Sequence, residues 1–263
     1  MLTAIGDVMR RVYERGWITT RDGNISMRKR AGKYLYITPS GWRKTIVHPE
    51  HIVRLEVLTD PVTGQLVPKV RDGQQPSGEL WMHWNLQRDT KKTRTVVHVH
   101  ATHIVAAIYA GIDLQAMSAE FPEISRYTRV GRTVPALPAL SRDLADVTAE
   151  CLGLKKDGTL EFDIVGQMNH GVCAVATDPW GAYEHIERLD HICEIVLKSG
   201  VVSKPLLNSR PSEEVRKIRQ KEKGAGGVIP SAPFVLWLHG LYPCRTIQFA
   251  LQRSEKANSN RQL

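Results

Sequence analysis

The sequence predicts a single α/β domain in which a mixed or antiparallel central sheet is flanked by helices. The chain has 263 residues, which is long enough for one domain with a sizeable core. Short apolar runs next to hairpin-like turns alternate with segments of helical periodicity. These runs do not follow the regular strand–helix alternation of a purely parallel sheet. An antiparallel or mixed arrangement is therefore expected.

The expected helices follow from apolar spacing and from capping residues. In residues 3–17, Ile5, Val8 and Val12 recur at helical spacing. Ser77 is the expected N-cap of the next helix. Further helices are expected at residues 77–88, 102–109, 141–152, 179–198 and 212–223.

The expected strands are short and rich in β-branched and aromatic residues. The turn Pro39-Ser40-Gly41 separates the first two of them. The five strands are expected at residues 34–38, 52–58, 95–100, 133–137 and 172–176.

Two histidines close the third of these runs, Thr95-Val96-Val97-His98-Val99-His100. Alternate side chains of a strand share a face, so His98 and His100 point the same way. Two imidazoles fixed on one face can supply two ligands of a tetrahedral metal. Glu79 and His170 are candidates to complete the set. The alternative is a surface pair or a hydrogen-bonded structural pair.

The histidine pair is one member of an ordered series of short motifs. The series is Asp22-Gly23-Asn24-Ile25-Ser26, Ile37-Thr38-Pro39-Ser40-Gly41, Pro76-Ser77-Gly78-Glu79, His98/His100 and His170-Gly171. This order resembles the class II aldolase/adducin family, which includes fuculose-phosphate aldolases and methylthioribulose-phosphate dehydratases. The resemblance covers residues 1–223 and implies a class II aldolase-like catalytic domain there. Residues 224–263 form a basic C-terminal extension that matches nothing assigned.

The resemblance implies a metal site held by Glu79, His98, His100 and His170. It also implies that Glu79 serves as an acid/base beside the metal. Three imidazoles and a carboxylate suit Zn²⁺, which is the expected cofactor, and Mn²⁺, Fe²⁺ or Co²⁺ would accept the same ligands. The remaining histidines His48, His83 and His103 are expected to be structural or polar surface residues.

The resemblance further implies a pocket for the substrate phosphate, built from backbone N–H groups at turns and from nearby hydroxyl and amide groups. Its expected residues are Gly23, Asn24, Ser40, Gly41, Ser77 and Gly78. Gly78 departs from the phosphate-sugar aldolases, which often have a second Ser or Thr there. One hydroxyl contact to the terminal anionic group is therefore missing.

Glu120 is the candidate for a second catalytic acid/base. It lies in Met117-Ser118-Ala119-Glu120-Phe121, which resembles the segment that supplies this group in the dehydratases. Fuculose-phosphate aldolases have a tyrosine near this point, and this chain has Ala119. The alternative for Glu120 is an exposed loop carboxylate.

Taken together, the resemblance implies a divalent-metal-dependent lyase that cleaves a phosphorylated ketose, a sugar 1-phosphate, by retro-aldol chemistry through a metal-bound enediolate. A dehydratase or decarboxylase with the same metal site is the alternative, and a non-catalytic adducin-like module is a third. The implied partners are a small phosphorylated sugar and further copies of the chain. The expected assembly is a homotetramer, as is common in the family.

Composition adds limits on partners and location. The net charge is +9, but residues 201–263 hold eleven Lys/Arg and four Asp/Glu, so most of the excess lies there. In that segment the basic residues are not interleaved with aromatic ones as in a nucleic-acid module, and no nucleic acid is expected as a partner. No apolar run approaches the roughly 20 residues of a membrane span, so no membrane is expected either. Four cysteines without Cys-x-x-Cys spacing favour a reducing cytoplasm.

Overall fold

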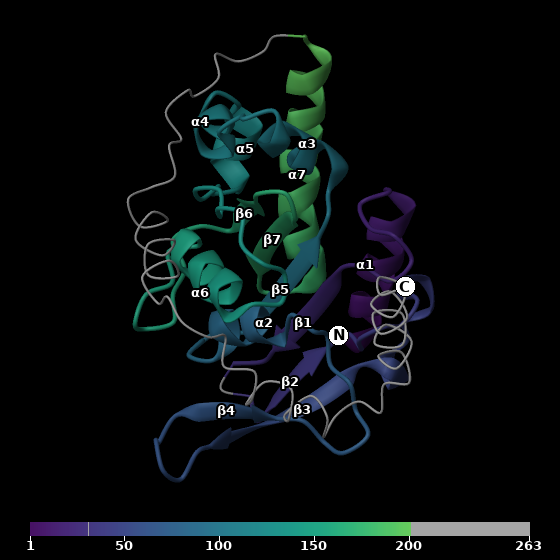
Figure 1. The fold of residues 1–263 in the computed structure, drawn as a ribbon, viewed down its shortest axis with the longest axis vertical. Coiled ribbons are helices and arrows are strands. Elements are labelled where there is room, and N and C mark those ends of the chain that lie inside the picture. Colours follow the sequence, from purple (N-terminus) through teal and green to yellow (C-terminus); the bar gives the residue numbers. More distant parts are fainter. Residues whose placement is uncertain (31, 201–263) are drawn as a thin grey trace, which may run out of the picture. The chain divides into compact units, whose positions relative to one another are not determined.

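The computed structural model describes residues 1–30 and 32–200. In this part of the chain seven strands form one sheet in the order β4-β3-β2-β1-β5-β7-β6, and every neighbouring pair is antiparallel (Figure 1). The strands are β1 Asn24–Arg28, β2 Tyr34–Ile37, β3 Val53–Thr59, β4 Leu66–Lys69, β5 Arg94–Val99, β6 Ile164–Gln167 and β7 Gly171–Ala176. The predicted α/β fold with an antiparallel central sheet is confirmed.

Seven α-helices accompany the sheet in the described residues, with two short 3-10 helices after β2, Lys44–Ile46 and Pro49–His51. The α-helices are α1 Leu2–Glu14, α2 Leu80–Gln87, α3 Thr102–Tyr109, α4 Leu114–Ala119, α5 Pro122–Tyr127, α6 Arg142–Cys151 and α7 Pro179–Lys198. Ser141 caps α6 through its hydroxyl, which accepts from the Leu144 N–H at 3.0 Å. The Asp178 carboxylate caps α7 in the same way.

Alternation along the strands divides the core into two layers. Val97 and Val99 of β5 belong to a cluster with α1, α3 and α7. Val96, which precedes them and points to the opposite face, belongs to a second cluster with α2 and α6. His98 has the parity of Val96, so its ring lies on the α2 side of the sheet. A third cluster packs Trp84 of α2 onto β2 and β3.

Two predicted elements are wrong in detail. Ser77 is not the N-cap of α2, which begins at Leu80 with Glu79 as its N-cap residue; Ser77 instead accepts from the Glu79 N–H at 3.3 Å. Residues 133–137 are not a strand, because only Val134 pairs there, through an isolated parallel bridge to Gln167. The prediction missed five short elements, β1, β4, β6, α4 and α5. The predicted helix 212–223, the domain boundary at 223 and the extension lie outside the described residues.

A buried carboxylate on α7 fixes the start of α3, the helix that follows the histidine pair. Asp190 is 3% exposed and accepts from the Trp17 indole N–H at 3.0 Å and the Ile104 N–H at 3.2 Å. It also accepts from the backbone N–H and the ring of His103, each at 2.9 Å. His103 is therefore a structural residue that ties α3 to α7, in line with its predicted role.

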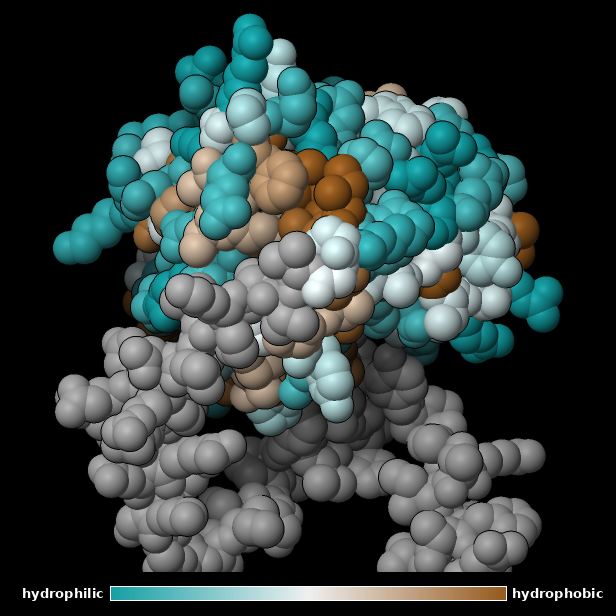
Figure 2. All heavy atoms as spheres, turned by 90° about the horizontal axis from the view of Figure 1, so that it is seen from above, coloured by the Kyte–Doolittle hydropathy of each residue, from teal (hydrophilic) through white to brown (hydrophobic). Residues whose placement is uncertain are grey.

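Figure 2 shows hydrophilic side chains over most of one face, interrupted by a smaller apolar area. The most exposed large apolar side chains of the described residues include Val62 at 91% and Tyr109 at 83%. None of the described helices is both long and apolar enough to cross a membrane.

Candidate metal centre

Two segments that are distant in sequence bring three histidines together. Within the sheet, His98 pairs with Asn24 on one neighbour and with Cys173 on the other. His100 follows the strand, and its N–H donates to the Trp17 carbonyl at 2.9 Å, which holds the strand end in place. His170 lies in the three-residue turn between β6 and β7.

The three imidazoles form a compact triangle. Ring centroids are 5.2 Å apart for His98 and His100, 4.8 Å for His98 and His170, and 5.4 Å for His100 and His170. One potential ligand atom from each ring lies within 4.8 Å of the others. The structure thus brings together the three predicted histidine ligands, at the place where β5 ends and β7 begins.

Glu79 completes the cluster from the start of α2. Its Oε2 lies 3.2 Å from His98 Nε2, and its Oε1 lies 3.4 Å from His170 Nε2. The carboxylate is 6% exposed. A buried carboxylate at this distance from two imidazole nitrogens requires a positive charge between them or a proton on a ring.

The tautomer of His98 favours a metal as that positive charge. Its Nδ1 lies 3.1 Å from the Val172 carbonyl, which accepts, so Nδ1 carries the hydrogen and Nε2 presents a lone pair to Glu79. A backbone carbonyl on the far ring nitrogen is the usual support of a metal-bound histidine. His170 Nδ1 is buried and has no hydrogen-bond partner among the described residues. These donors fit a divalent cation.

Electrostatics support neutral imidazoles at the centre. Burial lowers the pKa of His98 well below its ordinary value, and the neighbouring His100 and His170 add to the shift. Burial and His170 also lower the pKa of His100. Neutral histidine is the form that binds a metal, so these rings need not lose a proton on binding near neutral pH.

Gly171 is required by the close approach of the rings. A Cβ at this position would lie 2.5 Å from the Val99 carbonyl oxygen, 2.9 Å from His100 Cδ2 and 3.0 Å from His98 Cε1. The position of a Cβ is fixed by the backbone, so no side-chain rotation would relieve its contact with the Val99 carbonyl oxygen.

We expect Gly171→Ala to destabilise the fold by about 1–3 kcal/mol, as overpacking does, and to weaken metal binding. Thermal unfolding and a metal titration measure the two effects. Gly181→Ala on α7 is the matched control, because its Cβ would meet the Ala176 Cβ at 3.1 Å and the Asp178 carboxylate at 3.5 Å, and neither residue belongs to the metal cluster. Equal stability and affinity of Gly171→Ala and the unmodified protein would contradict this account.

Asn24 and His83 form a buried support for Glu79 that the sequence analysis missed. Asn24 Nδ2 donates to Glu79 Oε2 at 3.2 Å, and Asn24 Oδ1 contacts His83 Nε2. His83 Nδ1 lies 2.6 Å from the Ser26 hydroxyl. His83 is fully buried, and burial lowers its pKa to about 3, so it is neutral. The sequence signal was the polar–apolar alternation of Asn24–Arg28, whose polar face turns toward α2.

The structure brings two predicted parts of the phosphate pocket side by side. An antiparallel bridge joins Pro39 to Pro76, and the Ser77 N–H donates to the Thr38 carbonyl at 3.1 Å. Ser40 and Gly41 thus lie beside the segment with Ser77 and Gly78. Gly23 has a positive φ of 70° directly before β1, and a Cβ there would meet Ile18 at 2.7 Å. The Asn24 amide is engaged by Glu79 and His83.

Glu120 lies apart from these contacts. It follows α4 as its C-cap residue and is exposed. Among the described residues, no hydrogen bond or ion pair links its side chain to the histidines or to Glu79. Within a single chain, Glu120 is therefore not part of the cluster formed by Glu79 and the three histidines.

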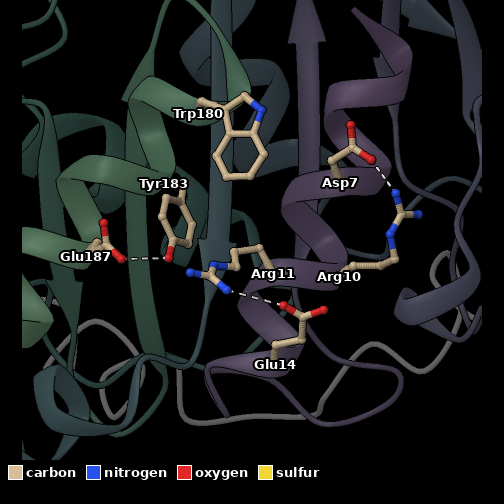
Figure 3. A pocket seen from close by; sticks show the side chains of 7 residues that line it. All are labelled: Asp7, Arg10, Arg11, Glu14, Trp180, Tyr183 and Glu187. Atoms are coloured by element: carbon tan, nitrogen blue, oxygen red, sulfur yellow. Dashed lines mark hydrogen bonds and ion pairs between the residues drawn. The ribbon is translucent and has the colours of Figure 1, made fainter.

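A separate groove of about 460 Å³ lies between α1 and α7 (Figure 3). Its charged side chains pair with one another: Arg11 with Glu14 at 3.5 Å, Arg10 with Asp7, and the Tyr183 hydroxyl with Glu187 at 2.8 Å. It contains none of the predicted site residues.

The comparison with known sequences assigns the family. Residues 3–197 match the family described as "Class II Aldolase and Adducin N-terminal domain". The chain belongs to the class II aldolase/adducin family. The predicted resemblance is thereby confirmed.

Relatives and a solved structure agree with this membership. The "L-fuculose phosphate aldolase" of Methanococcus maripaludis is 24% identical over 194 residues, covering 74% of this chain and 94% of the relative. The "Methylthioribulose-1-phosphate dehydratase" of Methylococcus capsulatus is 26% identical over 189 residues, covering 69% and 85%. A sugar-phosphate aldolase from Thermotoga maritima shares the fold, with a TM-score of 0.60 at 21% identity over 76% of this chain and 95% of that chain.

Proposed function

We propose that this protein is a divalent-metal-dependent lyase that cleaves a phosphorylated ketose by retro-aldol chemistry. The observation that carries the proposal is the cluster of three imidazoles, one buried and two half-buried, closed by the buried Glu79. A carboxylate and three neutral histidines form a donor set typical of catalytic zinc sites. Zn²⁺ is the proposed metal, and Mn²⁺, Fe²⁺ and Co²⁺ suit the same donors.

The chain's own residues would divide the work at this site. His98, His100 and His170 would hold the metal, which when bound supplies Lewis-acid stabilisation of negative charge developing on substrate oxygens. Glu79 would move a proton at the reacting carbon, because it is the carboxylate nearest to the histidines. Asn24 holds that carboxylate in place through its amide N–H.

The substrate's phosphate would bind at the paired turns. Backbone N–H groups near Gly41 and Gly78, with the hydroxyls of Ser40 and Ser77, are suited to phosphate oxygens. The bridge between Pro39 and Pro76 supports this placement by holding the two turns together. Gly23 and Asn24 were expected to contribute as well. Asn24 would do so only through its backbone, since its amide is engaged.

Dehydration or decarboxylation is the alternative reaction. Each of the three reactions needs stabilisation of negative charge next to a carbonyl, so the metal cluster serves them equally. The dehydratase among the relatives is the specific observation that favours water loss. In that reaction Glu120 would be the second acid/base, reached in the assembled oligomer.

One assay separates these reactions. The purified, metal-loaded protein is incubated with a panel of ketose 1-phosphates and, separately, with a phosphorylated 3-oxo sugar acid, because carbon dioxide can come only from a substrate that carries a carboxylate. Three products are quantified: a three-carbon ketose phosphate, water loss as a new carbonyl compound, and carbon dioxide. Release of the three-carbon phosphate is expected. Exclusive water loss or carbon dioxide release would replace the aldolase assignment by the alternative.

We also propose that the chain assembles into a homotetramer in the cytoplasm. Oligomerisation would place the exposed Glu120 segment near a neighbouring copy, and it would bury the sequence Phe234-Val235-Leu236-Trp237-Leu238, which lies outside the described residues. Sedimentation velocity of the full chain is expected to give a tetramer. A monomer would contradict the proposal. A tetramer that survives truncation after Lys223 would show that the extension is dispensable for assembly.

A further inference from the structure

A continuous line of buried polar side chains runs from α2 through β1 to Glu79. Its members are Gln87, Ser26, His83, Asn24 and Glu79, and none is more than 7% exposed. The contacts are Gln87 Nε2 to the Ser26 hydroxyl, Ser26 to His83 Nδ1 at 2.6 Å, His83 Nε2 to Asn24 Oδ1, and Asn24 Nδ2 to Glu79 Oε2 at 3.2 Å. The line continues from Glu79 to His98, so it ends at the metal centre.

The carboxylate fixes the direction of every hydrogen bond in this line. An ionised carboxylate only accepts, so the amide NH₂ of Asn24 must face Glu79 and its oxygen must face His83. His83 Nε2 must then carry the hydrogen. A neutral imidazole has one such hydrogen, so His83 Nδ1 is an acceptor, and the Ser26 hydroxyl donates to it. The Ser26 oxygen in turn accepts from Gln87.

The five groups are therefore joined by hydrogen bonds that all run in one direction, from the donor Gln87 to the acceptor Glu79. If His83 carried its hydrogen on Nδ1, its Nε2 lone pair would face the Asn24 oxygen at hydrogen-bond distance. The Asn24 amide would then turn, and its oxygen would face the Glu79 carboxylate. Two facing acceptors in a buried site are unfavourable, so the wrong tautomer would displace Glu79.

We propose that His83 is a positioning residue of the metal centre: as the Nε2–H tautomer it orients the Asn24 amide, which in turn holds Glu79 toward His98. This inference rests on the proposed metal centre and adds a residue to it. The His83 ring makes no hydrogen bond to the three histidines or to the Glu79 carboxylate; its contacts are with Ser26 and Asn24, so the ring acts on Glu79 through Asn24.

Two substitutions of His83 test the proposal. Glutamine places an N–H group near the position of the imidazole Nε2 and keeps the donor to Asn24. Asparagine reaches only the Nδ1 position and loses that donor. The probe is Co²⁺, whose affinity and visible absorption spectrum report the ligand geometry without any substrate. His83→Asn is expected to weaken Co²⁺ binding by roughly 10–100-fold, as loss of an outer partner does, and His83→Gln to restore most of it.

A double-mutant cycle tests whether His83 acts through Asn24. Asn24→Ala is expected to weaken Co²⁺ binding as much as His83→Asn does, and the double variant should bind no more weakly than Asn24→Ala alone. Fold losses that multiply in the double variant would overturn the proposal. The proposal would also be overturned if His83→Asn bound Co²⁺ with the affinity and the absorption spectrum of the unmodified protein. Equal losses of Co²⁺ affinity in His83→Gln and His83→Asn would overturn it as well.

A measurement on the unmodified full chain covers the case in which a buried His83 variant does not fold. Nitrogen-15 NMR of labelled histidines distinguishes the two neutral tautomers and the charged ring. A hydrogen on Nε2 alone supports the proposal, and a hydrogen on Nδ1, alone or with Nε2, overturns it. Failure of the unmodified protein to bind Co²⁺ would refute the metal centre instead, and the NMR result would still decide the orientation of Asn24.

Discussion

His100→Ala is expected to lose bound metal and to lower turnover by roughly a thousandfold or more, because Lewis-acid stabilisation is worth several kcal/mol. The same result is expected for His98→Ala and His170→Ala, since each ring supplies a ligand atom to the triangle. Elemental analysis after dialysis measures the metal, and circular dichroism checks the fold. The fold should persist, because the hydrophobic clusters on both faces of the sheet do not depend on the metal.

His191→Ala is the matched control for these variants. His191 lies on α7 with 64% of its side chain exposed, and its nearest acidic partner is Glu194 at 3.9 Å. This variant should keep one equivalent of metal and full turnover. Stoichiometric metal in the dialysed His100→Ala protein would refute the ligand assignment.

Glu79→Gln is expected to keep most of the metal and to lose about 10²–10⁴-fold in turnover. Three imidazoles remain to bind the cation, and the oxygen of the new amide can still accept from Asn24. The new side chain cannot move a proton, and loss of a positioned general acid–base group costs about that much. Elemental analysis and steady-state kinetics on the same preparation separate the two effects.

Two further carboxylate variants serve as comparisons for Glu79→Gln. Glu123→Gln on α5 removes an exposed carboxylate near Glu120 and should leave both metal and turnover unchanged. Glu120→Gln should lower turnover only if Glu120 is the second acid/base. Near-normal turnover of Glu79→Gln would assign proton transfer to another group.

The sequence was sufficient for the features that depend on local pattern. The alternation of a strand is enough to put His98 and His100 on one face, and the structure keeps both beside His170. The start of α6 was also readable from the sequence, because Ser141 caps the helix through a contact only three residues away. The short strands β1, β4 and β6 were missed because four or five residues carry little periodicity.

Ser77 and the segment 133–137 show where local rules fail. Ser77 has the residue type of an N-cap, but its backbone N–H is taken by the Thr38 carbonyl and the helix starts three residues later. Residues 133–137 look like a strand, yet only Val134 pairs there, through one bridge to Gln167 of the edge strand β6. Tertiary hydrogen bonds outweighed local propensity in both cases.

The sequence by itself determined the family, the order of the motifs and the identity of the histidines that converge. The tertiary structure alone decided how Glu79 is held. Asn24 is 55 residues from Glu79 and 59 from His83, and no spacing rule links positions so far apart. An isolated histidine in a helix has no local signature, so His83 looked unremarkable in the sequence. Its role exists only because β1 and α2 pack face to face and place the His83 ring between Ser26 and Asn24.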